Sequence, residues 1–331
     1  IMRELVSTWG PYLKDFYEYK RLSGFKYNSA ESVIYQFDRY YKSLGINELK
    51  FTRDIVEPFL YIDRNKRIAT QNWKASVLRQ FGDYLIRHGI LDHIYLIPPI
   101  SLKGEAEFIP YIFSNEELSQ IINYLDSYTK SDIPGTFNGR CNTLNSVSTV
   151  IKVLMATGMR INEVLSLRKT DIDLDNQLFI VKEAKNNNER LIPFSNTIKH
   201  EIVNYILNTP FNINNHDRIF QIDEGKQLKA NRCWIYFNKA IKATGIKKDK
   251  GPRIHDLRHT YAVMALTQLQ KSEKNINLSL SYLSDYLGHK SLRETQKYLW
   301  ITPELFDEVK YKMSDYTSFI KDIYDGEKYD D

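Results

Sequence analysis

The sequence lacks the residues and segments on which several classes of protein depend. Only two cysteines, Cys141 and Cys233, occur among the 331 residues, far apart and without histidines at metal-ligand spacing. They offer neither a disulfide framework nor a zinc site, and they fit a reduced, cytoplasmic compartment. No apolar run approaches the ~20 residues that a membrane-spanning helix requires, so we expect no membrane segment.

Two further absences concern cofactors. The glycine-rich loop Gly-x-x-x-x-Gly-Lys, which holds nucleotide phosphates, does not occur, and no carboxylates gather at the spacing of metal ligands. We therefore expect chemistry that needs neither a nucleotide nor a metal ion, and no cofactor. The hydrophobic content of 42% is ordinary for a globular protein, and the length is sufficient for two domains.

Charge is present but unevenly distributed along the chain. The formal net charge is +5, yet residues 299–331 carry nine acidic and four basic side chains, a net of −5, which leaves +10 for residues 1–298. A basic body suits a polyanion such as DNA, whereas the acidic end is expected to avoid it. Charges that only keep a surface soluble would give the same totals.

Hydrophobic periodicity predicts a mainly α protein with two domains. Residues 1–92 are predicted to form a helical core domain, a bundle with helices at about 3–22, 29–44, 52–61 and 70–88. Prolines at 98, 99 and 110, which bar helix continuation, place an interdomain linker at residues 93–113.

The second domain, residues 114–331, begins with a capping box formed by Ser114 and Glu117. Residues 178–194 read as two short strands around an Asn-rich turn, the main strand content, with another short strand possible within 171–180. Helices are predicted at about 114–127, 144–157, 161–169, 196–208, 229–244, 255–270, 277–287 and 303–321.

Basic and amide side chains gather around the last two helices of the first domain. Lysine and arginine can neutralise phosphates, while amides can contact base edges or sugars. Charged helix faces are also commonly just solvated. The candidate DNA-binding residues are Arg53, Arg64, Lys66, Arg67, Asn72, Lys74 and Arg79.

The densest set of phosphate-handling side chains lies between residues 255 and 298. His255, Arg258 and His259 are three and four residues apart, so on a helix they share one face and can converge on one anion. A second helix ends at Gly288, which suits a left-handed cap, and His289 follows directly. Tyr298 comes nine residues later. Each of these features alone more often has a structural role, but their combination is a more specific indication of a catalytic site.

This combination, HDLRHT, then LGH, then a tyrosine, resembles the C-terminal active-site boxes of the tyrosine recombinase (phage integrase) family. Upstream, LMATGMRINEVLSLR is similar to the family's first box, which supplies Arg160 and, three residues on, Glu163. Lys185 stands eight residues before Pro193, where the family places its hairpin lysine, although Lys182 is a nearby alternative.

The resemblance implies a site-specific DNA recombinase with catalytic residues Arg160, Lys185, His255, Arg258, His289 and Tyr298. Tyr298 would attack a phosphodiester and form a 3′-phosphotyrosine, with Arg160, Arg258 and His289 binding the phosphate. His255 would accept the phenol proton, because an unperturbed phenol has a pKa near ~10. Lys185 would protonate the 5′-hydroxyl, and Glu163 and His259 are interpreted as supporting residues.

The family's fold and assembly follow as expectations. They comprise a two-domain C-shaped clamp on double-stranded DNA, with a SAM-like core-binding domain and a catalytic domain. A homotetramer would exchange the helix at about 303–321 between protomers. A partner recombinase or a directionality factor is compatible with this scheme.

The biological role is left open by the residues. A Xer-like or transposon-encoded member is favoured over an integrase with an arm-type domain, which would be absent or removed here. Abundant Lys, Asn, Ile and Tyr suggest an AT-rich genome, so an integrase or transposase of a mobile element is preferred over a chromosome-dimer resolvase. Two alternatives are a non-catalytic DNA-binding factor of the same fold and an enzyme like a type IB topoisomerase or telomere resolvase.

Overall fold

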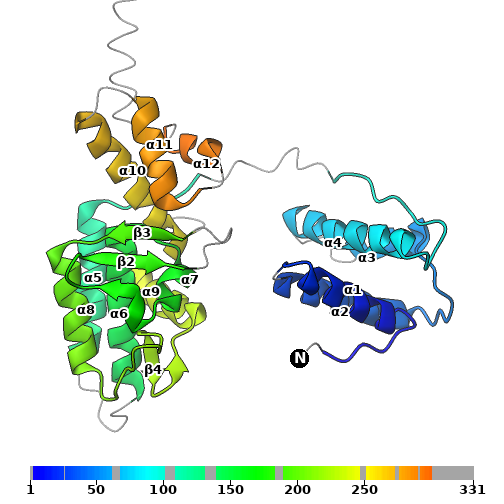
Figure 1. Ribbon diagram of the computed structural model, residues 1–331, viewed down its shortest axis with the longest axis horizontal. Helices are drawn as coiled ribbons and strands as arrows, with labels where there is room; N and C mark the ends of the chain where they lie inside the picture. The colour runs from blue at the N-terminus through cyan, green and yellow to red at the C-terminus, as the bar shows by residue number, and fades with distance from the viewer. Residues whose placement is uncertain are drawn as a thin grey trace, which may run out of the picture. The chain divides into compact units, whose positions relative to one another are not determined.

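The computed structural model describes residues 3–25, 27–61, 68–100, 109–130, 139–182, 189–246, 251–272, 276–289 and 291–299. The chain divides into two compact units, Ile1–Phe108 and Ile109–Asp331. Figure 1 shows that helices dominate the described parts of both units, with small antiparallel sheets confined to the second. The predicted mainly α fold class is therefore confirmed.

The first unit is the predicted bundle of helices. It contains α1 (Gly10–Leu22), α2 (Asn28–Ser43), α3 (Arg53–Tyr61) and α4 (Ile68–Arg87). Aromatic side chains fill its core; the Trp9 and Phe81 rings meet edge to face, with centroids 5.5 Å apart, and neither side chain is exposed. Such pairs add about 1 kcal/mol to the stabilisation from buried area.

The first helix begins later than the periodicity predicted, at Gly10 and not near residue 3. The buried Asp38 carboxylate on α2 accepts hydrogen bonds from the N–H groups of Val6 and Ser7, at 2.8 and 3.0 Å. These backbone donors are therefore satisfied outside a helix. Proline in the first turn of α1 then suits a helix start, since its missing N–H would have no partner there.

Both ends of the predicted linker pack onto a unit. Tyr95 N–H donates to the Phe51 carbonyl at 2.8 Å, and Ile97 is 7% exposed in the core of the first unit. Phe113, 1% exposed, belongs to the core of the second unit, and its N–H donates to Thr260 Oγ1 at 3.0 Å. The division between the units falls after Phe108.

The second unit is built around α6 (Gly139–Thr157), which packs against α5 (Asn115–Lys130), α8 (Asn196–Asn208), α9 (Ala230–Ala243) and α10 (Ile254–Ser272). The predicted capping box at the start of α5 is confirmed: Ser114 N–H donates to Glu117 Oε2, and Glu117 N–H to Ser114 Oγ. The N-terminal end of α6 extends further than the predicted start at residue 144.

A short antiparallel sheet lies beside these helices (Figure 1). It contains β1 (Ile172–Asp173), β2 (Leu178–Val181) and β3 (Arg190–Pro193), in the order β1-β2-β3. Strands β2 and β3 form the predicted hairpin, in a register that pairs Leu178 with Pro193 and Val181 with Arg190. A 3₁₀ turn, Lys169–Asp171, precedes β1.

Besides the 3₁₀ turn, three of the described elements were not predicted. Strands β4 (Gln221–Asp223) and β5 (Lys226–Gln227) form a two-stranded sheet, and α12 (Leu292–Gln296) follows α11 (Ile276–Leu287). All three are too short for a periodic pattern to be visible in the sequence. A further helix, α7 (Ile161–Ser166), agrees with the predicted segment at 161–169 but ends earlier.

Helices α10, α11 (Ile276–Leu287) and α12 enclose a separate small apolar core. Leu266, Leu283 and Tyr298 are among its buried members. The predicted helix at about 303–321 lies outside the described residues. Among the helices that are described, none is both long and apolar enough to cross a membrane.

Candidate active site

The turn between α6 and α7 presents the first predicted arginine. Gly158 ends α6 at φ +60°, and a Cβ there would lie 2.4 Å from Tyr261 Cδ1, so only glycine fits. Arg160 precedes α7, where its N–H donates to Glu163 Oε2 and its Nη1 to Glu163 Oε1, both at 2.8 Å. The Glu163 carboxylate thereby holds both the backbone and the guanidinium of Arg160.

Arg258 reaches this turn from α10. The residue is 3% exposed, with Nη1 donating to the Gly158 carbonyl at 2.9 Å and Nη2 to the Leu287 carbonyl at 2.6 Å. Burial, together with the positive charge of Arg160, lowers the pKa of Arg258 to about 10. The guanidinium is therefore still charged at neutral pH, and it joins the α6–α7 turn to the end of α11.

The end of α11 supplies the other side of the site. Gly288 adopts φ +64°, as expected for a left-handed cap, and its carbonyl accepts a hydrogen bond from Arg160 Nη2 at 3.1 Å. His289 Nδ1 lies 2.8 Å from Thr295 Oγ1 of α12, which fixes the ring. Burial and the charges of Arg258 and Arg160 lower the pKa of His289 to about 4. This imidazole is therefore neutral at neutral pH.

Tyr298 lies directly beside these groups. It is 3% exposed, and its ring stacks on His289 with centroids 6.2 Å apart and an interplanar angle of 21°. Its hydroxyl oxygen is 3.1 Å from His259 Nδ1. Burial raises the pKa of the Tyr298 phenol, while the positive charges of Arg258 and Arg160 act in the opposite direction. The phenol therefore carries its proton at neutral pH.

The two histidines of α10 differ in what they contact. His255 is exposed, and its ring meets His259 edge-on with centroids 4.8 Å apart. His259, predicted only as a supporting residue, is the one whose nitrogen lies within hydrogen-bond distance of the Tyr298 hydroxyl. Burial, followed by the charges of His255, Arg253, Arg258 and His289, lowers the pKa of His259 to about 3.

Arg190 is a site residue that the sequence analysis missed. From the start of β3, its Nη1 and Nη2 donate to the two carboxylate oxygens of Glu163 at 3.2 and 2.7 Å, and its Nε donates to the Tyr286 carbonyl at 3.0 Å. Only 11% of the side chain is exposed. The one available signal was an arginine inside a strand, since nothing in the sequence links it to a glutamate 27 residues away.

Of the two candidate hairpin lysines, Lys182 lies among the described residues. Lys185 lies outside the described residues. The alternative, Lys182, directly follows β2 and has Nζ 2.6 Å from Asp171 Oδ1 in an ion pair. Its ammonium group is thus already bound to a carboxylate of its own domain, which makes Lys182 the weaker candidate.

The four predicted DNA-binding residues of the first unit that the structure describes lie in different environments. Arg53 is exposed, with Nε 3.1 Å from Glu57, and Asn72 is half-buried on α4. Lys74 is only 5% exposed and its ammonium lies 4.7 Å from the centre of the Phe59 ring, a cation–π distance, so a contact with phosphate would require this side chain to turn outward. Arg79 donates to the carbonyls of Ile97 and Pro98. Arg64, Lys66 and Arg67 lie outside the described residues.

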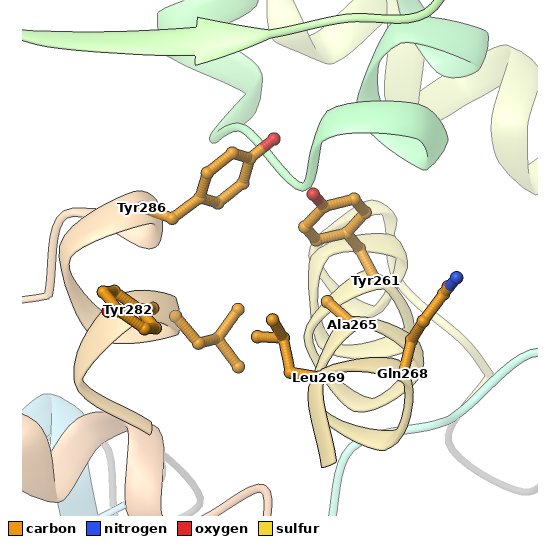
Figure 2. Close-up of a pocket in the computed structure, with 7 residues that line it drawn as sticks. Tyr261, Ala265, Gln268, Leu269, Tyr282 and Tyr286 are labelled. Carbon is orange, nitrogen blue, oxygen red and sulfur yellow. The ribbon is translucent and has the colours of Figure 1, made fainter. Parts of the chain in front are cut away.

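An apolar cavity of about 360 Å³ lies between α10 and α11, next to the site (Figure 2). Tyr261 and Tyr286 form one end of it, with nearly parallel rings 5.6 Å apart. The Tyr286 hydroxyl donates to the Thr157 carbonyl at 3.1 Å. Tyr286 therefore attaches α11 to the last residue of α6, close to the turn that carries Arg160.

No group of three or more His, Cys, Asp or Glu side chains within the described ranges is arranged to hold a metal ion. Cys233 is buried, and burial raises its pKa to about 12, so this thiol is not a nucleophile at neutral pH. Cys141 has no described side chain. Among the described residues, the side chains that gather at the site carry guanidiniums, imidazoles, a phenol and the Glu163 carboxylate.

The fold is that of the tyrosine recombinases. A structure titled as the XerH site-specific recombinase bound to difH substrate, a pre-cleavage complex, superposes with a TM-score of 0.66 at 19% identity, covering 90% of this chain and 95% of that one. A Tn1549 transposon integrase in complex with circular intermediate DNA gives 0.58 at 16% identity, over 87% and 94% of the two chains.

Sequence relatives agree with the fold. A putative integrase/recombinase, y4rB, of Sinorhizobium fredii is 23% identical over 326 residues, 93% of this chain and 98% of the relative. Tyrosine recombinase XerD of Oceanobacillus iheyensis is 26% identical over 304 residues, 88% and 93% of the two chains. The model of the phage integrase family matches residues 113–304, more than half of the sequence. The chain belongs to this family, the tyrosine recombinases, and is a DNA strand-transferring enzyme.

Proposed function

We propose that this recombinase cleaves and rejoins double-stranded DNA at a specific site through a 3′-phosphotyrosine formed by Tyr298. The observation that carries the proposal is the meeting of both predicted phosphate-binding arginines at the end of α11. Arg160 and Arg258 donate to the successive carbonyls of Gly288 and Leu287, and Tyr298 stacks on His289, the next residue along the chain.

The charge of the site supports an anionic ligand. Arg160, Arg190 and Arg258 bring three guanidiniums together, and Glu163 offers one carboxylate to two of them. Arg258 is buried and donates to two neutral carbonyls. A buried cation without a matching anion is unfavourable, so a phosphodiester entering here would be strongly attracted.

In the proposed reaction, the Tyr298 oxygen attacks phosphorus and forms the P–O(Tyr) bond, while the bond from phosphorus to the 5′-oxygen breaks. Arg160, Arg258 and the neutral His289 stabilise the charge that develops on the non-bridging oxygens. Lys185 protonates the departing 5′-oxygen. Attack by the 5′-hydroxyl of another strand reverses these steps, and because the ester conserves the bond energy, no nucleotide triphosphate is consumed.

The wider biology is part of the same proposal. The enzyme acts as a homotetramer on two duplexes, with residues of about 303–321 exchanged between protomers, in the cytoplasm. It integrates and excises a mobile element, as an integrase or transposase. The AT-rich character of the composition supports this, and relatives named as integrases and as Xer recombinases are compatible with it.

The test is covalent trapping. Duplexes that bind the full chain are selected from a random-sequence pool, nicked near the candidate cleavage position, and incubated with the unsubstituted protein or with the Tyr298→Phe variant. A short fragment then leaves and traps the ester, which a denaturing gel resolves as a shifted band. We expect this band with the unsubstituted protein and not with the variant, which lacks the attacking hydroxyl.

Two other results would contradict the proposal. Tight binding of selected duplexes by the full chain without any adduct indicates a DNA-binding factor that has lost the chemistry. Relaxation of supercoiled DNA by the monomer, without sequence preference, indicates chemistry like that of a type IB topoisomerase.

A further inference from the structure

Of the two histidines on α10, the inner one contacts the nucleophile. His259 Nδ1 is 3.1 Å from the Tyr298 hydroxyl oxygen, a normal hydrogen-bond distance, and the two rings lie with centroids 5.7 Å apart. His255 stands one turn earlier, is exposed, and packs its ring against His259. The arrangement is a row of three side chains that leads from solvent to the buried phenol.

Building on the proposed function, we propose that His259 is a catalytic residue that accepts the proton of Tyr298 during attack, in the place that the sequence suggested for His255. With its own proton on Nε2, His259 offers an unprotonated Nδ1 to the phenolic O–H. As the P–O(Tyr) bond forms, the proton moves from the Tyr298 oxygen to Nδ1. It returns to Tyr298 when the 5′-hydroxyl of the next strand displaces the phenolate.

The surroundings of His259 make this transfer dependent on DNA. The ionisable groups that lower the pKa of His259 are His255 and Arg258 on α10, Arg253 just before that helix, and His289 after α11. All of them, like burial, disfavour an imidazolium in the free protein, so His259 is a weak base until a phosphate arrives. A phosphodiester beside Arg258 supplies negative charge and raises the basicity of His259. The phenol is thereby activated only when its target is in place.

His255 retains a different role in this scheme. Its ring packs against His259 at an interplanar angle of 87° while the residue is exposed, so it covers the inner histidine and can contact a phosphate oxygen or water. Substitutions of His255 and His259 are therefore expected to have different effects on adduct formation, although the two residues lie one turn apart on one helix. A matched pair of substitutions separates the two assignments.

The experiment compares His259→Asn with His255→Asn in the full chain, on the nicked duplex selected with the unsubstituted protein. An asparagine amide occupies roughly the position of Nδ1 but cannot hold a proton. We expect His259→Asn to form the Tyr298 adduct about 10²-fold more slowly, the contribution typical of general base catalysis. DNA affinity in a mobility-shift assay should be nearly unchanged.

Rescue by a more acidic phenol is the decisive measurement. A fluorinated tyrosine at position 298 has a more acidic phenol and so needs a base less. By Brønsted behaviour, it should raise the rate of adduct formation in His259→Asn at least ~10-fold. It should restore little to His255→Asn. A merely structural loss would not respond to the acidity of the phenol. His259→Gln serves in the same test if His259→Asn fails to bind the duplex.

The outcomes are distinguishable. No adduct with the unsubstituted protein overturns the proposed function itself. An adduct that forms at an unchanged rate in His259→Asn, or a rescue seen with His255→Asn and absent with His259→Asn, leaves the proposed function in place and overturns the role of His259.

Discussion

Arg190 and Glu163 form a two-point ion pair, with Nη1 to Oε1 at 3.2 Å and Nη2 to Oε2 at 2.7 Å. The same carboxylate binds the backbone and side chain of Arg160, and the Arg190 Nε binds the Tyr286 carbonyl near the end of α11. Arg190 therefore connects β3, α7 and α11, three of the elements around the site. Through Glu163, Arg190 thus positions Arg160, which is proposed to bind the phosphate, although Arg190 has no proposed contact with the reacting atoms.

We expect Arg190→Lys to weaken both stability and adduct formation. A lysine cannot bind the two carboxylate oxygens and the Tyr286 carbonyl at once, because it lacks the planar guanidinium fork. Loss of charged hydrogen bonds predicts about 2 kcal/mol less free energy of unfolding. Misplacement of Arg160 predicts roughly 10- to 100-fold slower adduct formation.

Urea denaturation and the covalent trapping assay measure these two effects. Arg168→Lys is the control, because Arg168 is an exposed arginine of the same unit with Nη1 on a single carbonyl, that of His216. Equal rates for Arg190→Lys and Arg168→Lys would show that Arg190 has no positioning role.

Gly158→Ala should be more damaging than an alanine at another glycine of similar conformation. Gly158 and Gly245 have φ values of +60° and +70°, so both substitutions strain the backbone by about 1–2 kcal/mol. Only at Gly158 does the new Cβ collide, at 2.4 Å from the Tyr261 ring, while Gly245 has nothing within 4 Å.

The clash at Gly158 adds about 1–3 kcal/mol of overpacking. Since the Gly158 carbonyl also holds Arg258, adduct formation should fall in Gly158→Ala and persist in Gly245→Ala. Chemical denaturation and trapping give both quantities. Equal losses of stability in the two variants would contradict the contact with Tyr261.

Glu163→Gln should lose stability in a pH-dependent way. Burial alone would raise the pKa of Glu163, but the hydrogen bonds and charges of Arg190 and then Arg160 outweigh it and lower the pKa below its ordinary value. The ionised group therefore contributes stability above the unfolded-state pKa of ~4.3. That contribution is lost as the pH falls through the lower folded-state pKa.

At pH 7 we expect Glu163→Gln to reduce the free energy of unfolding by about 3 kcal/mol, because Arg190, 11% exposed, and the partly buried Arg160 lose the counter-charge of a buried carboxylate. The difference between the two proteins should shrink as the pH is lowered from 5 toward 3. Denaturation series at several pH values provide the measurement, and a difference that stays constant over this range is the result that contradicts it.

His259 and His289 should stay neutral in the DNA-free protein. Burial is the largest cause that lowers their pKa values, to about 3 and about 4, whereas histidines of an unfolded chain titrate near ~6.5. Because the unfolded chain binds protons more readily, these residues reduce the free energy of unfolding as the pH falls below that value.

Ring-nitrogen chemical shifts from NMR test this directly, with the two signals assigned through His259→Asn and His289→Asn. Neither signal should move between pH 8 and pH 5.5. The urea-unfolded chain, titrated in the same buffers, is the control. A titration midpoint near that of the unfolded chain for either signal would contradict the expected neutral state of these two histidines.

Much of the fold was predictable because it depends on local patterns. Helical periodicity identified α2, α4, α5, α8 and α9 within a few residues of their observed bounds, and Ser114 with Glu117 marked the start of α5. Short elements without periodicity, such as β4 and α12, could not be found in this way. The early start assigned to α1 failed because Asp38, on another helix, binds the backbone of residues 6 and 7.

For the site, the sequence by itself determined which side chains are available and in what order, because residue type and spacing are local properties. Tertiary structure decided which of them meet. It joined Arg190 to Glu163, removed Lys74 from solvent, and brought His259 rather than His255 to the hydroxyl of Tyr298. These contacts join residues distant in sequence, or depend on which helix face is turned inward, and both are fixed only when the cores pack.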